Sequence, residues 1–560
     1  MPKRLGLVCF LGFAALFLIW NRAAYKGYFQ DDELDNVSWI GYVPAMQFAE
    51  GLVTPRFQPN NFRPVGHLYF SICERLFGLS FPKWVAVLHA IHLLNVWLLW
   101  LLVRRLGSPP LAAGAACLFF GLHSALFDAV WKPMYAFDVL CATFCLLSIL
   151  LYIGRHWVLA FIAFWLAYKA KEVAVMLPLV LAAAELWFGK GDWKRRWLPL
   201  APFFAASLSF GLQGILLNPN QDNAYTFRFT PQALAQTSMF YAGRIFLLPY
   251  AGFALPLAAL AWRKPRVWFG LTAAAILFFP LLFLPGRMFD AYCYVPFTGL
   301  AVAFSGAAQS IHPAVLALFF LLWAPLDLSE LRRDRRATLA LDDQIREWVT
   351  SVARFVSTSP KPEAVIYEGT IPGFAYWGQT GAVHYLYHDL ALKVLYIADP
   401  QAARLTLAPH VAVLAWNDGT RKLAIRFRTP EQDKPYLEMS APDAPGQLGE
   451  GWYSLQGEYR WTAPQAVVEL LRPAGAHRFE LRFLVGPAQL HAQGKVTAQV
   501  SIEGRQLDAQ IFRKTGWQTA VWELPPAPAG PVKVTLIAPP YQAPPDLRTL
   551  GLAVGGIGFK

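Results

Sequence analysis

Long apolar runs recur along the first 330 residues and are separated by short polar turns. About 20 apolar residues cross the hydrocarbon core of a bilayer as one α-helix. By that measure the sequence predicts about eleven transmembrane helices, near residues 5–20, 84–103, 111–130, 134–153, 157–168, 173–188, 197–217, 238–261, 267–284, 292–308 and 311–326. The fifth and sixth are short and meet at a charged corner, so we expect them to tilt or break there.

The pattern changes after residue 330, where polarity rises. A helix-like period continues to about residue 356, and the runs EAVIYEG, HVAVLAW and KLAIRF then alternate with turns, which predicts a soluble α/β or α+β segment. From Gly451 onward, runs such as AVVELL, HRFELRFLV and VTAQVSI lie between Pro and Gly clusters, which is typical of a β-sandwich or jelly roll. The pattern therefore predicts a membrane domain (1–330), a mixed α/β segment (331–444) and a β-sandwich (445–560).

Composition supports the membrane assignment. The chain is 56% hydrophobic and 15% charged, with a mean hydropathy of +0.35, which excludes an ordinary soluble enzyme. Basic residues are densest in the short turns 104–109, 154–156, 189–196 and 262–266, so the positive-inside rule places these turns in the cytoplasm. The N-terminus is then cytoplasmic, and the long loop 21–82 and everything after residue 330 lie outside.

The net charge of +13 faces anionic membrane lipids in this topology, and nothing in it indicates a nucleic-acid partner. The first segment has no small-residue cleavage site, so we interpret it as a retained anchor. The six cysteines lie in or beside apolar segments, and the exported tail has none. Disulfides therefore do not hold that tail together, and the composition favours a bacterial inner membrane with a periplasmic C-terminal domain.

Candidate chemistry begins with the stretch YFQDDELDN, residues 28–36, which follows the first apolar run. It holds four carboxylates, Asp31, Asp32, Glu33 and Asp35. Two adjacent acids at a low-dielectric boundary repel each other, which should raise one pKa and suit that acid to act as a base. The alternative for Asp31 and Asp32 is that they are solvated acids that simply end the membrane span. We expect Glu33 and Asp35 to be solvated.

Several motifs occur in a particular order along residues 5–310. They are the retained first span, the acidic pair, an FRP element at 62–64, an H-x-x-N pair (His92 and Asn95) in a segment ending VRRLG, the stretch GLHSALFDAVW, an AKE corner before a Pro-bearing span, and DAYCYVPFTGL. Together they resemble the GT-C glycosyltransferases, and most of all the branch of the protein O-mannosyltransferases. The chain departs from that pattern in three places: it has His123-Ser124 instead of histidine-proline, it has Tyr292 and Tyr294 at a distance from Arg287, and its tail is β-rich.

The resemblance implies a GT-C-like fold for the membrane domain. It also implies transfer of a hexosyl or mannosyl-like sugar from a polyprenyl-phosphate donor to an acceptor hydroxyl outside the cytoplasm, with inversion of configuration. Such chemistry needs a carboxylate to take the proton of the hydroxyl, and Asp31 or Asp32 suits that role. It also needs cations for the leaving phosphate, and Arg63, Lys171 and Arg287 belong to external loops that could converge. Magnesium or manganese held by Asp31 and Asp32 could share the task, and the residues leave that open.

The remaining candidates have two interpretations each. Arg63 could instead position its loop, Lys171 and Glu172 could form an ion pair at the helical corner, and Arg287 could reach lipid headgroups. The supporting candidates are Glu172, His67, His123, Tyr294 and Arg244, of which Arg244 lies inside a predicted span and needs a partner there. For His92 and Asn95 we expect packing between helices.

Three functions are compatible with the sequence. The first is the membrane glycosyltransferase, whose acceptor is an unidentified protein, lipid or polysaccharide. The second is a transporter or flippase for a lipid-linked sugar, which should carry ionisable residues deep in several spans and show repeat symmetry. The third is a noncatalytic envelope polysaccharide assembly protein, for which eleven spans would be more than an anchor needs. The outer-loop position of the charged candidates favours the first.

Overall fold

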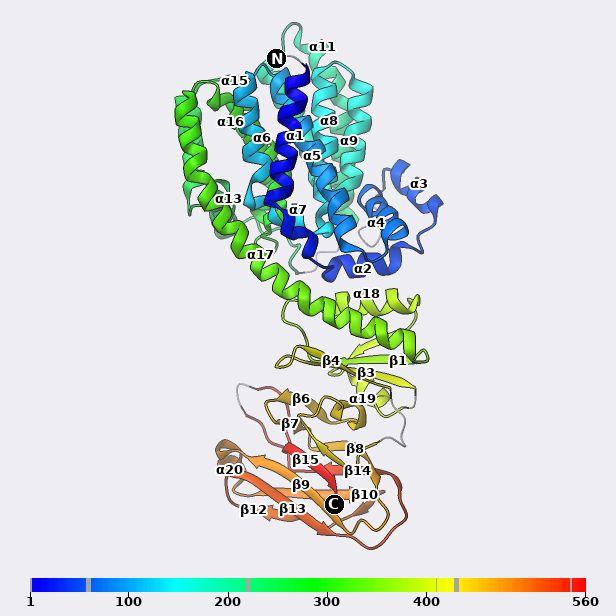
Figure 1. Cartoon of the computed structure of the whole chain (residues 1–560). Helices are drawn as coiled ribbons and strands as arrows, with labels where there is room; N and C mark the ends of the chain where they lie inside the picture. Colours follow the sequence, from blue (N-terminus) through cyan, green and yellow to red (C-terminus); the bar gives the residue numbers. More distant parts are fainter. Residues whose placement is uncertain (1–2, 57–61, 218–221, 409, 428–432, 544–545) are drawn as a thin grey trace. The chain divides into compact units, whose positions relative to one another are not determined.

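The computed structural model describes residues 3–56, 62–217, 222–408, 410–427, 433–543 and 546–560, so residues 57–61 of the long predicted loop lie outside the described part. It divides into two compact units, Met1–Asp342 and Asp343–Lys560. The first unit is helical (Figure 1), with α1 (Lys3–Trp20), α2 (Asp31–Ile40), α3 (Ala45–Val53), α4 (Pro64–Phe77), α5 (Phe81–Arg105), α6 (Pro110–Leu122), α7 (Phe127–Trp131), α8 (Ala136–Ile153), α9 (Trp157–Ala170), α10 (Leu177–Phe188), α11 (Trp193–Trp197), α12 (Ala201–Leu217), α13 (Pro231–Phe246), α14 (Leu255–Ala261), α15 (Pro265–Phe278), α16 (Tyr294–Ala308) and α17 (Pro313–Thr358).

Membrane-spanning length is reached by five helical segments within the described residues, and by up to seven if each of two bent helix pairs is one span. The five are Phe81–Arg105, Pro133–Ile153, Pro265–Phe283, Asp290–Ala308 and Pro313–Thr358. Three shorter apolar helices coincide with further predicted spans, Val8–Trp20, Trp157–Ala170 and Leu198–Gln213. The chain is therefore an integral membrane protein, while the predicted number of eleven spans is not confirmed.

Small residues let α15 and α16 approach each other closely. A Cβ atom added at Gly299 would lie 2.6 Å from the backbone nitrogen of Ala274, and one added at Gly270 would lie 2.6 Å from the carbonyl oxygen of Gly299. Within a bilayer, helices associate through this kind of close packing because burial of apolar side chains from water gives no driving force there. The two helices thus pack backbone against backbone.

Helix α17 is continuous from Pro313 to Thr358, with Pro325 inside it. The polar run LRRDRR at 331–336 therefore does not end an element, because one helix can pass from an apolar to a polar environment without a break. The boundary between the compact units falls after Asp342, later than residue 330. The predicted helical period to about residue 356 is confirmed.

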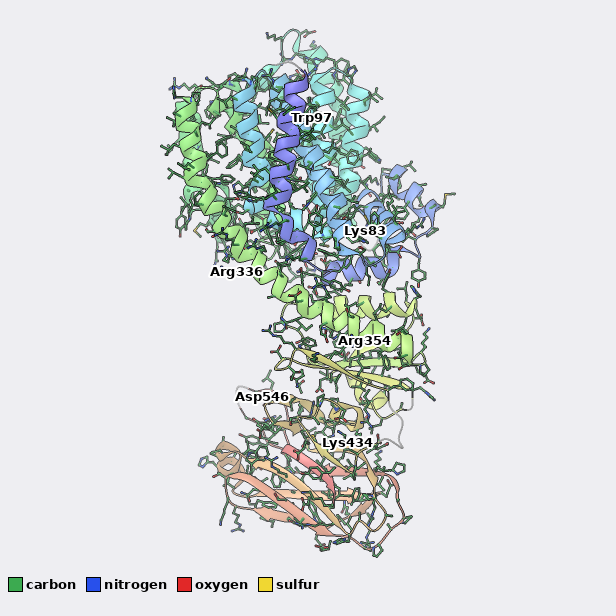
Figure 2. All side chains as sticks on the ribbon, viewed as in Figure 1. Lys83, Trp97, Arg336, Arg354, Lys434 and Asp546 are labelled. Atoms are coloured by element: carbon green, nitrogen blue, oxygen red, sulfur yellow. The ribbon has the colours of Figure 1, made fainter. Side chains whose placement is uncertain are left out.

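Helices α2, α3 and α4 lie at one end of the helical unit, and α11 lies at the other (Figure 1). Lys83, at the start of α5, lies near α4, whereas Trp97 is further along the same helix, towards the α11 end (Figure 2). The Lys83 Nζ atom is 5.7 Å from the ring centroid of Phe77 in α4. The acid-bearing segment therefore sits at the end of the helical unit opposite α11.

The second unit begins with a mixed sheet in the order β2-β1-β3-β4. Strand β1 pairs in parallel with β2 and β3, and β4 is antiparallel to β3. These elements are β1 (Ala364–Glu368), α18 (Tyr376–Tyr387), β2 (Lys393–Tyr396), α19 (Pro400–Leu405), β3 (Val411–Asn417) and β4 (Lys422–Phe427). The three strand-like runs predicted for this segment lie in β1, β3 and β4, as expected.

Two further sheets complete the second unit, in the orders β11-β10-β14-β8 and β13-β9-β15-β7-β6. Alternate residues of β9, from Phe479 to Val485, are fully buried in the core between strands of both sheets. Their strands are β5 (Tyr436–Glu438), β6 (Trp452–Gln456), β7 (Tyr459–Thr462), β8 (Gln465–Arg472), β9 (Arg478–Val485), β10 (Val496–Ile502), β11 (Arg505–Gln506), β12 (Gln510–Phe512), β13 (Gly516–Glu523), β14 (Gly530–Ile537) and β15 (Ala553–Phe559), with helix α20 (Pro487–Gln493). The predicted sheet-rich C-terminal part is confirmed.

Candidate active site

The acidic pair opens helix α2. Asp31 and Asp32 are the first two helical residues and are half-buried. The N-terminus of a helix carries free backbone N–H groups and a partial positive charge, both of which favour carboxylates. The first turn of α2 therefore presents two acids at the end of the helical unit where α2–α4 lie.

Glu33 is not solvated, which corrects the expectation from the sequence. Its side chain is 2% exposed and accepts hydrogen bonds from the backbone nitrogens of Gln30, at 3.1 Å, and Met134, at 3.0 Å. Burial raises the pKa of Glu33 to about 7, although both amides and Lys132 favour its ionised form. Within this acidic run, Glu33 holds α2 against the turn at residues 133–135.

Arg63, Lys171 and Arg287 come from distant parts of the sequence, and the structure brings them together. Arg63 precedes α4, and its Nε atom lies 2.6 Å from Oε1 of Glu172. Lys171 precedes the short 3-10 turn that begins at Glu172, and its Nζ atom lies 2.5 Å from Oδ2 of Asp138 in α8. Burial opposes ionisation of Glu172, but the Arg63 guanidinium lowers the pKa of that carboxyl below its ordinary value, so the pair is ionic.

Tyr292 joins Arg287 to the other two cations. Its hydroxyl accepts a hydrogen bond from Nη2 of Arg287 at 3.0 Å, and its ring centroid lies 4.5 Å from Nζ of Lys171. The Arg287 guanidinium also lies over the rings of Tyr225, at 4.4 Å, and Phe289, at 4.6 Å. Arg63 interacts electrostatically with Asp138 and Tyr292 as well. The three cations thus share one neighbourhood.

Tyr135 connects this neighbourhood to α2. Its hydroxyl lies close enough to Asp128, Asp138, Tyr292 and Glu33 to be influenced by their charges. The residue before its turn, Lys132, lies 2.9 Å from Asp128 and interacts with Glu33. The turn at 133–135 is therefore the physical link between the acid-bearing helix and the cations.

The charges of the cluster leave an excess of one positive charge. The Arg63–Glu172 and Lys171–Asp138 pairs each neutralise themselves. Arg287 contacts three aromatic rings and has no carboxylate partner within the described residues. An anion with a single charge would complete this cluster, and Arg287 is the cation best able to bind it.

His67 positions its neighbours and does not carry charge. It is 3% exposed, and burial lowers its pKa to about 3, so the ring is neutral at physiological pH. Its Nδ1 atom accepts from the Arg63 backbone nitrogen at 2.8 Å, and Nε2 lies 2.9 Å from Oδ1 of Asn36 in α2. This histidine therefore ties the start of α4, where Arg63 lies, to α2.

Three other candidates lie in different surroundings. His123 is buried, bonds through Nε2 to the carbonyl oxygen of Ile245 at 3.0 Å, and packs against Phe119, Phe297 and Trp323. The hydroxyl of Tyr294 bonds to His92 and Asn95, which confirms that this pair packs between helices. Arg244 has the partner expected inside a span, because its Nε atom lies 2.9 Å from Asp290.

Sequence reasoning missed Asp138 and gave Tyr292 less weight than Tyr294. An acid within an otherwise apolar segment, as Asp138 is in AFDVLCA, marks a functional or paired position in membrane helices, and that signal was available. Nothing in the sequence distinguishes Tyr292 from Tyr294. Which of the two faces Arg287 depends on where the helix begins, and the sequence does not locate that residue. The structure starts α16 at Tyr294 and leaves Tyr292 in the preceding turn.

A metal site needs several oxygen, nitrogen or sulfur ligands in one place. In the described part of the chain, no group of three or more His, Cys, Asp or Glu side chains could hold a metal ion. Magnesium or manganese at Asp31 and Asp32 would thus depend on ligands from the substrate.

Comparison with known proteins gave structural neighbours only. No family model and no curated protein matches the sequence. ArnT from Cupriavidus metallidurans, in a crystal structure with undecaprenyl phosphate bound, is 15% identical with a TM-score of 0.46, over 75% of this chain and 94% of that one. The Archaeoglobus fulgidus oligosaccharyltransferase is 11% identical with a TM-score of 0.47, over 99% and 97% of the two chains.

The arabinofuranosyltransferase AftD from Mycobacteria is 12% identical with a TM-score of 0.44, over 99% of this chain and 58% of AftD. These neighbours are GT-C glycosyltransferases, the class that the sequence motifs resemble. With TM-scores below 0.5, the role of each residue rests on the geometry described above.

Proposed function

We propose that this protein is a membrane glycosyltransferase that moves a sugar from a polyprenyl-phosphate donor to an acceptor hydroxyl on the extracytoplasmic side. The observation that carries the proposal is the meeting of Arg63, Lys171 and Arg287 around Tyr292, beside the helix that begins with Asp31 and Asp32. A polyprenyl phosphate esterified to a sugar carries one negative charge, which equals the excess positive charge of the cluster.

Arg287 is the first contact for the donor phosphate, because it has no acidic partner within the described residues. Lys171 and Arg63 lie beside it but are already paired with Asp138 and Glu172. As the bond from the anomeric carbon to the phosphate oxygen breaks, the leaving phosphate gains a second negative charge. Fixed cations in a site with little water stabilise that developing charge most strongly.

Asp31 or Asp32 takes the proton of the acceptor hydroxyl as its oxygen forms the new bond to the anomeric carbon. Both acids lie in the first turn of α2, where the partial positive charge of a helix N-terminus favours carboxylates. Attack opposite the phosphate gives inversion, as the family resemblance implies. The acceptor remains a protein, lipid or polysaccharide hydroxyl, and the bacterial inner membrane with a periplasmic C-terminal unit remains the proposed location.

Sugar transfer by purified variants tests this function. In liposomes with a labelled polyprenyl-phosphate sugar, Asp31→Asn or Asp32→Asn should lower turnover by at least about 100-fold, since general-base catalysis contributes 10²–10⁴-fold. Asp222→Asn is the matched control, because Asp222 is an exposed acid paired with Arg228 and belongs to neither α2 nor the cation cluster. Full turnover in both α2 variants would remove the base from the proposed mechanism.

A further inference from the structure

Two buried carboxylates hold the short segment that leads into the acidic pair. Asp342, in α17, is 1% exposed. Its Oδ2 atom accepts from the backbone nitrogen of Tyr28 at 3.0 Å, and its Oδ1 atom accepts from the side-chain nitrogen of Gln30 at 2.7 Å. Glu33 accepts from the backbone nitrogens of Gln30 and Met134. Residues 28–33 are thus fixed at two points by acids from two different helices.

These contacts fix the backbone on either side of Asp31 and Asp32. Gln30 is the N-cap of α2 and Glu33 is its third residue, so the bond between them sets the angle at which the chain enters the helix. The acidic pair lies between the two fixed ends. A shift of the segment by one ångström would displace both carboxylates, and a displacement of that size can cost a reaction about 100-fold in rate.

The packing around this segment leaves it little freedom to move. A Cβ atom added at Gly27 would lie 2.6 Å from the ring of Phe81 and 3.0 Å from Oδ2 of Asp342. Lys132 is paired with Asp128 at 2.9 Å and also lies within electrostatic reach of Glu33 and Asp342. The charges around Glu33 come from Lys132 and from Asp32 itself.

Stability alone does not account for these two acids. Taking a carboxylate out of water is costly, and well-packed apolar side chains often stabilise a site at least as well as buried charges do. Here both Glu33 and Asp342 accept hydrogen bonds from Gln30, and Asp342 also accepts one from Tyr28, so both acids bind residues just before the acidic pair. Because both acids bind the residues that lead into α2, they hold the start of that helix in position.

We propose that Glu33 and Asp342 are positioning residues that orient Asp31 and Asp32 for proton abstraction, an inference that rests on the proposed function. Neither residue touches the reacting atoms. Each acts through the backbone and the side chain of residues 28–30, and Glu33 also acts through the turn at Met134.

Kinetics of Glu33→Gln and Asp342→Asn test the proposal. Each amide keeps one acceptor oxygen but turns an NH₂ group towards a donor, so each variant loses one bond. Turnover with saturating donor should fall by about 10- to 100-fold, while the donor KM stays within about two-fold because the phosphate cluster is untouched. In an Asp32→Asn background, neither change should lower turnover much further, since residues that act as a unit are not additive.

A matched control separates position from general stability. Glu185 is a buried acid paired with Arg155 at 2.9 Å and Arg196 at 3.2 Å, beside α11 at the opposite end of the helical unit (Figure 1). Glu185→Gln should destabilise the protein by a comparable amount and keep the turnover of the folded fraction. Equal losses of turnover in all three variants, or a raised donor KM with unchanged turnover, would overturn the positioning role.

Hydrogen exchange distinguishes failure of this inference from failure of the proposed function. Asp342→Asn should speed backbone exchange in residues 27–34 and leave residues 63–77 of α4 unchanged. If the wild-type protein transfers no sugar, the proposed function fails. Faster exchange in Asp342→Asn that is confined to residues 27–34 would still support the role of Asp342 in holding this segment. Unchanged exchange in residues 27–34 of Asp342→Asn overturns the positioning role, whatever the activity.

Discussion

Burial distinguishes Glu33 from the other acids of residues 31–35. Its carboxylate is buried against the turn at 133–135, whereas Asp31 and Asp32 are half-buried. One residue of separation along a helix turns a side chain by about 100 degrees, so neighbours in sequence face different environments. The roles that we propose, a positioning acid at Glu33 and a reacting acid at Asp31 or Asp32, are compatible with that rotation.

Glu33 also gives the protein a pH-dependent stability. Burial raises its pKa from 4.5 to about 7, so the folded chain binds this proton more tightly than the unfolded chain. The contribution of Glu33 to the free energy of unfolding should therefore be largest below about pH 4.5. It should fall by about 3 kcal/mol at most as pH rises to about 7. Glu33→Gln is neutral at every pH and should lack this decrease.

Melting temperatures in detergent at about pH 5 and about pH 8 measure that difference. Between these two pH values, the melting temperature of the wild-type protein should fall further than that of Glu33→Gln. Parallel pH profiles for the two proteins would show that Glu33 does not titrate in the folded state in this range.

At the scale of elements, the turn at 133–135 and the close packing of α15 on α16 arrange the site. The turn contacts α2 through Met134. Helix α16 follows directly after the segment 290–293 that carries Tyr292. A shift of α16 along α15 would therefore move the hydroxyl that bonds to Arg287.

Gly299→Ala tests that packing. The added Cβ would press on the backbone nitrogen of Ala274 at 2.6 Å, so we expect a loss of about 1–3 kcal/mol from overpacking and a lower melting temperature. Gly243→Ala in α13 is the matched control, because a Cβ there meets nothing within 4 Å. If the two variants melt alike, contact with α15 does not fix the position of α16.

The sequence was sufficient for elements with a strong period. Alternation in HRFELRFLV predicted β9, and the long apolar run around 84–103 predicted the span in α5. It was not sufficient for the burial of Glu33 or for the pairing of Lys171 with Asp138. Those depend on which helices meet, and in an acidic run such as DDELD the local pattern is the same for an exposed acid and a buried one.

At the scale of the whole molecule, the local sequence pattern also fails to locate the boundary between the two compact units. Helix α17 hides the change from the membrane unit to the second unit, because its 46 residues continue across the point at which polarity rises. Within the second unit, Glu368 at the end of β1 accepts a hydrogen bond at 2.8 Å from Arg460 of β7, so the small mixed sheet and the sandwich are joined by a buried ion pair. Composition along the chain gives no sign of either connection.

We propose that the acids of α2 and the cations for the donor phosphate belong to one site. A structure of the protein with a polyprenyl phosphate bound tests it most directly. We predict a phosphate within hydrogen-bonding distance of Arg287 and adjacent to Lys171 and Arg63, with Asp31 or Asp32 facing the space beside it. A phosphate bound elsewhere, with Arg287 still held only by Tyr292 and its aromatic neighbours, would contradict the account.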